Sequence, residues 1–492
     1  MAVIPIPDWS PDQADYGNKG ALRIRNALPG ANSYKPMPMH TPLTGALGAR
    51  CRGAIEVRDK DLNIYQYAGD VDKLYSLSST TWNDVSIVGG YSTGTENIWE
   101  FVRWKNQVLA TNFDDNPQFI TLGGSNFANL TTAFKARRMF VVRDHVVAAN
   151  TWDSTDGNVP DRVRTSSFDD ETAWTVDPAT GSIARDIKSG PILKGYGGDY
   201  GLMFTEKDTY RMDWVGAPTW FEINPTLQGI GILSPGACAR IGDTVYAWTN
   251  QGFLAITFGT GYEPIGAGRV DQYLFNDLDD SYRYRMSAVS DPRAGRIFWA
   301  YPGAGNDSGQ PNRIVCFDKN FNKWSIIDED VDLLWQASGI GTTLEGLDSF
   351  SSSIDDLLVS LDSSQWKGGG ASLFGAFDTD FKHGFYDGSP KTATLETREV
   401  EINEGQQTTV NSYRPLVDGG SFTSCIGSRN SQTEERTYTT PRSPTSTGRV
   451  TERKNARYHT FKMDVSGEWS DVIGIQLDAK DARVSGRRGR TD

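Results

Sequence analysis

The feature that most constrains this chain is a large aromatic residue that follows a polar turn at a nearly constant spacing. Six positions show this pattern: Trp82, Phe127, Trp174, Trp220, Tyr262 and Trp324. Successive members are separated by 45, 47, 46, 42 and 62 residues. A repeat in the forties is typical of the four-stranded blades of β-propellers. The spacing therefore predicts an all-β fold with a β-propeller of six to seven blades.

The runs between these aromatics have the length and composition of short strands. Residues 108–112, 200–205, 245–249 and 296–300 are apolar and end at Gly, Asp, Asn or Pro, which favour tight turns. Such runs are too short for most helices. One short amphipathic helix is expected near residues 270–278, and 354–361 is ambiguous between helix and strand. The chain lacks a WD or Kelch signature, so a pair of β-sandwiches stays open as the alternative.

Composition divides the chain into three parts. Residues 1–50 contain seven prolines, which resist regular structure, and are expected to form an extended N-terminal arm. Residues 51–388 hold the repeat and are expected to form the propeller. Residues 389–492 have a longer, Thr-rich alternation, for example at 392–402, 458–465 and 472–477. This period of two predicts a C-terminal antiparallel β domain of the sandwich type.

Charge is unevenly distributed along the chain. The net charge is −13, yet residues 389–492 carry 16 basic against 14 acidic residues. The most acidic stretch, 328–380, has 11 acids and one base, Lys367. The most basic stretch, 429–458, has seven bases against three acids. An acidic chain is a poor candidate for reading a DNA sequence, because such binding depends on Lys and Arg neutralising phosphates.

Catalytic, metal and cofactor sites have little support in the sequence. The four cysteines and four histidines are widely scattered, without the spacing of a zinc or redox motif, and no phosphate-binding GxxxxGK[ST] loop occurs. The glycine-rich residues 195–201 are expected to form a hairpin loop. We therefore expect no cofactor, no metal and no enzymatic activity. The alternative is a carbohydrate-active propeller, since residues 167–174 are similar to a propeller-glycosidase turn at Ser167, Asp169 and Trp174 but depart from it at Glu171 and Ala173.

Membrane insertion and export have no sequence signal. No run reaches the roughly 18 consecutive apolar residues of a membrane helix. The first seven residues lack a basic region and contain two prolines, unlike a secretory leader. We expect a soluble chain without a membrane segment or cleaved leader.

Part of the chain resembles the packaged-DNA stabilisation, or tail nozzle, proteins of short-tailed bacteriophages. The resemblance covers roughly residues 136–280 and is carried by residues 136–139, 160–166, 192–196, 200–204, 208–216, 229–238 and 245–248. It implies a propeller protein that forms a ring, expected to be a hexamer, below the portal and the adaptor (head–tail connector) of a phage head. Such a nozzle retains packaged double-stranded DNA, passes it without sequence preference at ejection, and anchors tailspikes, fibres or a tail needle. The resemblance places the protein in the virion tail, assembled in the host cytoplasm.

Two charged stretches are candidate sites for that role. The candidate acidic lining of the DNA channel consists of Asp355, Asp356 and Asp362, which would repel DNA during ejection. The candidate basic docking segment for an acidic neighbour consists of Arg429, Arg436, Arg442, Arg449, Arg453, Lys454 and Arg457. Ordinary solvated loops explain either stretch equally well, and a monomeric propeller that acts as an interaction scaffold is the further alternative.

Overall fold

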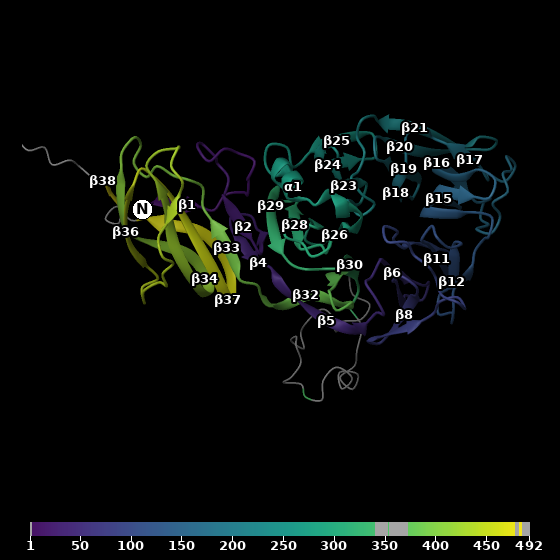
Figure 1. Ribbon diagram of the computed structural model, residues 1–492, viewed down its shortest axis with the longest axis horizontal. Helices are drawn as coiled ribbons and strands as arrows, with labels where there is room; N and C mark the ends of the chain where they lie inside the picture. The colour runs from purple at the N-terminus through teal and green to yellow at the C-terminus, as the bar shows by residue number, and fades with distance from the viewer. Residues whose placement is uncertain (1, 340–352, 354–371, 478–481, 485–492) are drawn as a thin grey trace, which may run out of the picture.

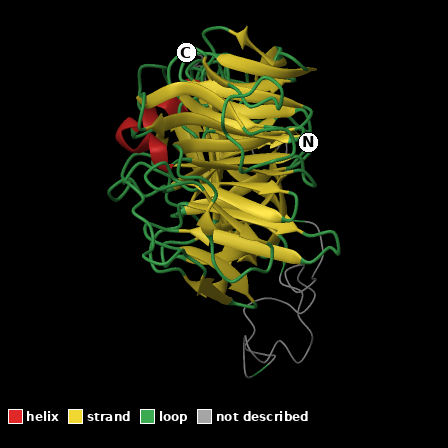
Figure 2. Ribbon diagram, turned by 90° about the vertical axis from the view of Figure 1, so that its right-hand side faces the viewer, coloured by secondary structure: helices red, strands yellow, loops and turns green. Residues whose placement is uncertain are grey.

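The computed structural model describes residues 2–339, 353, 372–477 and 482–484. Its regular structure is almost entirely β strand, apart from the short helix α1 (Asp271–Asp277) and the 3₁₀ turn η1 (Asp280–Arg285). The strands form a propeller, on the right of Figure 1, and an antiparallel β domain, on the left. Figure 2 shows the helical segment at one side of a molecule built otherwise from layered strands. The helix expected near 270–278 is confirmed.

The propeller consists of four-stranded antiparallel meanders that follow one another in the chain. The first three sheets contain β6 (Gly53–Arg58), β7 (Ile64–Gly69), β8 (Leu74–Ser78) and β9 (Thr81–Asp84); β10 (Glu100–Trp104), β11 (Gln107–Thr111), β12 (Gln118–Thr121) and β13 (Ala128–Asn129); and β14 (Lys135–Val142), β15 (His145–Asp153), β16 (Gly157–Thr165) and β17 (Ala184–Asp186). The next two contain β18 (Ile192–Tyr196), β19 (Tyr200–Thr205), β20 (Thr209–Gly216) and β21 (Trp220–Leu227); and β22 (Cys238–Ile241), β23 (Thr244–Thr249), β24 (Gly252–Thr257) and β25 (Gly261–Pro264). The all-β class and the propeller are thus confirmed.

Two further four-stranded units complete the ring. One contains β26 (Ser287–Asp291), β27 (Arg296–Tyr301), β28 (Arg313–Asp318) and β29 (Lys323–Asp328), and the other contains β30 (Leu333–Ala337), β31 (Leu373–Phe377), β32 (Lys382–Pro390) and β5 (Pro38–Ala46). Six of the sheets are separate, whereas β26–β29 form the edge of a larger, 14-stranded sheet among the described residues. The first strands of most neighbouring units lie side by side, and β30 lies against β6. Strands β18 and β22 are connected by the Tyr196 hydroxyl, which donates to the Cys238 carbonyl oxygen at 3.0 Å, so the ring is closed.

Strand β5 closes the last unit of the ring from the N-terminal part of the chain. It pairs with β32, whose Phe385 lies opposite Thr41. Its prolines are compatible with this place because it is the outer strand of its sheet, where a missing backbone N–H breaks no ladder on the free side. Nε1 of Trp82, in the first blade, donates a hydrogen bond to Oγ1 of Thr44 at 3.0 Å and so joins the two ends of the ring.

The C-terminal β domain is dominated by two long strands. It contains β33 (Ala393–Glu396), β34 (Thr408–Arg429), β35 (Thr437–Tyr438), β36 (Val450–Ala456), β37 (Tyr458–Leu477) and β38 (Ala482–Val484). Residues 458–465 and 472–477, expected as two strands, are parts of the single strand β37. The hydrogen-bond ladder between β34 and β37 runs along both strands, with register shifts near Gly419. The φ of Gly419 is +76°, a conformation that suits glycine.

The first fifty residues are more ordered than their proline content predicts. They include β1 (Ala2–Pro5), β2 (Arg23–Arg25), β3 (Ala27–Pro29) and β4 (Tyr34–Pro36) in addition to β5. Strands β1 and β4 pair with β37, while β2 lies between β29 of the propeller and β33 of the C-terminal domain. This segment therefore connects the two bodies through one continuous sheet.

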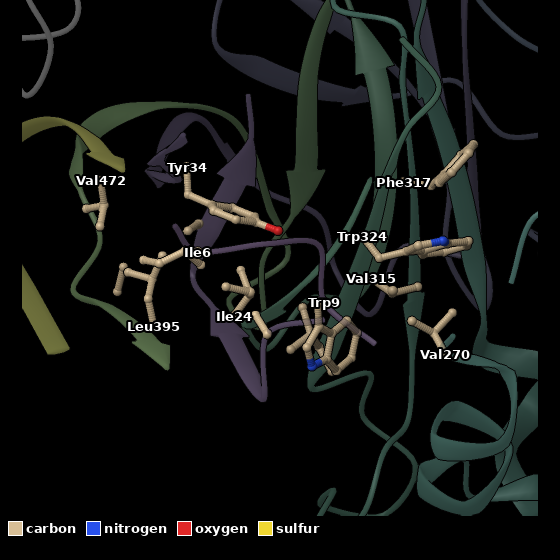
Figure 3. Close-up of a cluster of buried hydrophobic side chains, with 14 of the residues drawn as sticks. Ile6, Trp9, Ile24, Tyr34, Val270, Val315, Phe317, Trp324, Leu395 and Val472 are labelled. Atoms are coloured by element: carbon tan, nitrogen blue, oxygen red, sulfur yellow. The ribbon is translucent and has the colours of Figure 1, made fainter. Parts of the chain in front are cut away.

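A shared hydrophobic core reinforces that connection. Figure 3 shows Trp9 and Ile24 of the N-terminal segment between Trp324 of the propeller on one side and Leu395 and Val472 of the C-terminal domain on the other. These five side chains are at most 3% exposed. Burial of apolar surface on this scale is the main favourable contribution to folding, so the N-terminal segment holds both bodies to one core.

The surroundings of His383 predict that acid destabilises the fold. It is fully buried in β32 among Trp335, Phe377 and Phe385, and both ring nitrogens lack a hydrogen-bond partner among the described residues. Burial, assisted by the nearby His40, lowers the pKa of His383 well below 6.5.

We expect the free energy of unfolding to fall as the pH drops below about 6.5, because the unfolded chain then binds a proton that the folded chain excludes. His383 alone lowers the free energy of unfolding by up to about 1.4 kcal/mol for each pH unit below that value. Urea unfolding between pH 7.5 and 5 measures it, and a His383→Leu variant should show a shallower pH dependence. An unchanged slope in that variant would contradict the assignment.

Candidate functional site

A cavity of about 400 Å³ lies at the centre of the propeller. It is lined by residues from six of the first strands, β6, β10, β18, β22, β26 and β30, or from the residues directly before them. Because each first strand lies nearest the propeller axis, this cavity is the central channel. Its walls are mixed, with Trp99, Phe101 and Trp335 beside charged side chains.

Three charged residues from three different blades meet at the channel wall: Glu100 and Lys194 line the cavity, and Arg138 is buried beside them. Nζ of Lys194 lies 2.7 Å from Oε1 of Glu100, and Nη1 of Arg138 lies 3.6 Å from Oε2 of the same carboxylate. Burial lowers the pKa of Arg138 to about 10, although Glu100 opposes the shift. Two cations thus share one carboxylate, so this part of the wall carries a surplus positive charge.

The described lining of the channel offers charged side chains but no pair of carboxylates. Among its described lining residues Glu100 is the one carboxylate, whereas glycoside hydrolysis ordinarily uses a pair roughly 5 to 9.5 Å apart. Across the described residues no group of three or more His, Cys, Asp or Glu side chains could hold a metal ion. The turn at residues 167–174 is a folding element, in which Nε1 of Trp174 donates to the Glu171 carbonyl oxygen at 2.7 Å.

A second candidate site lies on the propeller face formed by the turns between first and second strands and between third and fourth strands. We call it the arginine–aromatic strip: Arg143, Tyr200, Arg211, Trp214, Val215 and Phe258. The guanidinium of Arg143 lies 4.7 Å from the ring centre of Trp214. That of Arg211 lies 4.3 Å from the ring centre of Tyr200 and donates to the Phe258 carbonyl oxygen at 3.0 Å.

The strip is exposed despite its apolar content. Trp214, Val215 and Phe258 are 37%, 47% and 46% accessible to solvent. Trp, Tyr and Arg are the residue types enriched at protein–protein interfaces and among their energetic hot spots. The strip therefore has the composition of an interaction surface that spans three consecutive blades.

The similarities found between this chain and known proteins are to solved structures. No family model and no curated protein matches the chain. Solved structures similar to it include BamB from Moraxella catarrhalis, with 10% identity, a TM-score of 0.34, and 63% of this chain and 87% of that chain covered. The Pan2 WD40 domain of Neurospora crassa has 8% identity, a TM-score of 0.37, and coverage of 63% and 91%. YCF48 bound to D1 peptide has 10% identity, a TM-score of 0.37, and coverage of 63% and 90%. The strand pairing itself defines the propeller.

The acidic candidates Asp355, Asp356 and Asp362 lie outside the described residues. Their role as a channel lining stays a prediction. No helix in the described part of the chain is both long and apolar enough to cross a membrane.

The basic docking candidates lie in the C-terminal domain, where four of them are paired with acids of the same chain. Nε of Arg429 and Nη2 of Arg436 lie 2.6 and 3.2 Å from Oε2 of Glu399. Arg442 pairs with Glu452 at 2.8 Å and Arg457 with Glu401 at 2.6 Å, while Nη1 of Arg449 donates to Oγ of Ser412 at 3.2 Å. Arg442 and Arg453 are the exposed members, and Lys454 is half-buried. Docking stays a prediction, and the exposed pair is where it can be tested.

The N-terminal segment joins the same ionic cluster. Nη2 of Arg436 donates to Oδ2 of Asp15 at 3.1 Å, and Asp15 lies 3.5 Å from Arg429. Charge counting alone does not identify these partners, because Asp15 and Arg436 are separated by 421 residues.

Proposed function

We propose that this chain is a structural subunit without enzymatic activity, that it assembles with copies of itself into a ring, and that this ring is the tail nozzle of a short-tailed phage. The observation that carries the proposal is the exposed arginine–aromatic strip on blades that also carry the sequence resemblance. The residues of the resemblance, roughly 136–280, run from β14 to α1 and so include the whole strip.

A ring follows if the strip binds a different surface of the next copy. Such a head-to-tail interface generates a closed ring when its rotation closes. The expected number of copies is six. A propeller joined to a second β domain by one sheet and one core suits this role, because a rigid subunit transmits the geometry of its contacts around the ring.

In the proposed nozzle, the ring extends the portal and adaptor channel, retains packaged double-stranded DNA and lets it pass at ejection. The outer surface anchors tailspikes, fibres or a needle. The resemblance supports these finer roles, together with location in the virion tail after assembly in the host cytoplasm.

Light scattering and electron microscopy of the purified chain, alone and mixed with phage particles that lack their nozzle, test the proposal. A ring with a central channel that docks on the particles supports it. A chain that stays monomeric in the presence of the connector contradicts it, and turnover of a glycan would favour the carbohydrate-active alternative.

The strip itself gives a sharper prediction. Trp214→Ala and Arg143→Ala are each expected to weaken ring assembly by roughly thirty-fold, the effect of losing about 2 kcal/mol at an interface hot spot. Sedimentation over a range of protein concentrations measures it.

Val88→Ala is the matched control. Val88 is fully exposed in the loop between β9 and β10. Because successive strands of a blade run antiparallel, this loop lies on the propeller face opposite the strip. Equal assembly of all three variants would show that the strip is not the ring contact.

A further inference from the structure

One end of the central channel carries a concentration of arginines that the proposed nozzle role does not use. Arg50 and Arg52 come directly before β6, Arg285 comes before β26, and Asp332 comes before β30. Strand β30 lies beside both β26 and β6, so the starts of these three strands meet at the same mouth of the channel. Arg52 lines the channel itself, as do Met286 and Leu333, the neighbours of Arg285 and Asp332.

The charges at this mouth are unbalanced. Burial, with repulsion from Arg285 and Arg52, lowers the pKa of Arg50 to about 10. Burial likewise raises the pKa of Asp332 to about 6, although Arg50 and Arg285 oppose the shift. Arg50 and Arg285 thus act on Asp332, a carboxylate that holds its charge weakly, while Arg52 has Asp70 and Asp114 as its acidic neighbours.

Several polar atoms of this cluster have no partner. Nε of Arg52, Nε of Arg285 and Oδ2 of Asp332 are buried without a hydrogen bond to any described residue. Asp70, which also acts on Arg52, is already occupied, because it accepts bonds from the Tyr75 hydroxyl and from the backbone of Asp72 and Lys73. Buried polar groups in native proteins are normally satisfied, so the two unpartnered N–H donors of Arg52 and Arg285 indicate a missing hydrogen-bond acceptor beside these guanidinium groups.

We propose that the mouth formed by Arg50, Arg52 and Arg285 binds a phosphate-type oxyanion. The planar fork of a guanidinium matches the oxygens of a phosphate group, and charge-assisted bonds of this kind are about twice as strong as neutral ones. A dianion would offset the surplus positive charge and accept bonds from the unpartnered donors. The surplus charge of Lys194 and Arg138 beside Glu100 adds to the attraction. The site belongs to one subunit and does not require the ring.

Isothermal titration with inorganic phosphate at constant ionic strength tests this proposal. We expect saturable binding to the wild-type chain and at least a ten-fold loss of affinity in Arg285→Gln and in Arg50→Gln. Arg293→Gln is the matched control, since Arg293 is exposed at the opposite end of β26, in the turn to β27. Thermal unfolding without phosphate establishes that each variant is folded.

Each outcome of the titrations either supports or overturns the phosphate site. Phosphate binding that survives in Arg293→Gln and is lost in the other two variants supports the site. Absence of saturable binding to the wild type, or equal affinity in all variants, overturns it. A parallel titration with succinate tests the ligand class, and binding of succinate in place of phosphate would overturn the assignment to phosphate.

Discussion

Replacing Trp324 by alanine is expected to lower the free energy of unfolding by about 3–5 kcal/mol, a large share of the total stability of a domain. The indole is fully buried, with the rings of Phe317 and Phe253 at 4.7 and 5.0 Å, and its Nε1 donates to the Ile265 carbonyl oxygen at 3.1 Å. The substitution removes the largest side chain of this contact and leaves the Ile265 carbonyl oxygen with only the longer bond from Nη1 of Arg269, at 3.4 Å. Urea unfolding followed by circular dichroism measures the loss.

Phe321→Ala provides the control. Phe321 lies in the same hairpin, between β28 and β29, but is 42% exposed, so its loss should change stability by less than about 0.5 kcal/mol. Because the core around Trp324 also contains residues of the N-terminal segment and the C-terminal domain, we expect both bodies to unfold at the lower urea concentration. A variant in which only the propeller is weakened would contradict the shared core.

Replacing Glu399 by glutamine is expected to lower the free energy of unfolding by about 3–5 kcal/mol. The side chain of Glu399 is 3% exposed and accepts bonds from Arg429, Arg436 and Gln432. Glutamine has nearly the same shape but no charge, so two largely buried guanidinium groups would lose the buried one of their two shared carboxylates and keep the more exposed Asp15. The loss is measured by urea unfolding at pH 7.

The pH dependence of this contribution has a definite sign. Burial alone would raise the pKa of Glu399, but the bonds from Arg429, Gln432 and Arg436 together outweigh it and hold the pKa below its usual value. The stabilisation is therefore present above about pH 4.5 and is lost as the pH falls through the depressed pKa. Wild type and Glu399→Gln should converge in stability as the pH falls from 5 towards 3.

Glu401→Gln is the matched control, because Glu401 pairs with Arg457 at the surface. Its urea midpoint should stay unchanged. The comparison also bears on the basic docking segment: if Glu399→Gln leaves stability intact but weakens assembly, the arginines act mainly on a neighbour and not within the chain.

The aromatic repeat predicted the propeller because five of the six markers have the same place in their blades, while Trp174 lies in the connection between β16 and β17. Trp82, Trp220, Tyr262 and Trp324 lie in the fourth strands β9, β21, β25 and β29, and Phe127 comes directly before β13. The last unit has no such marker, since its outer strand is β5. The sequence could not reveal that β5 is a propeller strand, because Pro38 and Pro42 argue against a strand there. An edge strand such as β5 tolerates both prolines.

The candidate sites were less accessible to sequence reasoning. Glu100, Arg138 and Lys194 meet only because their strands are neighbours around the channel, and no local motif links them. A charged residue within a short apolar run is the signal that could have singled them out. The strip was visible in part, since Trp214 belongs to the residues that carry the resemblance, but its exposure and its contact with Arg143 depend on the packing of two blades.

The place of β5 has a consequence for the order of events during synthesis. This strand leaves the ribosome before every blade, yet its partner β32 begins at Lys382, more than 300 residues later. At roughly 5 to 20 residues per second, the early strand waits on the order of tens of seconds before it can pair. Ring closure is therefore a late step that joins distant parts of the chain, and such non-local pairing is slow. A growing chain must keep its first strands available and unaggregated until nearly the whole protein has been made.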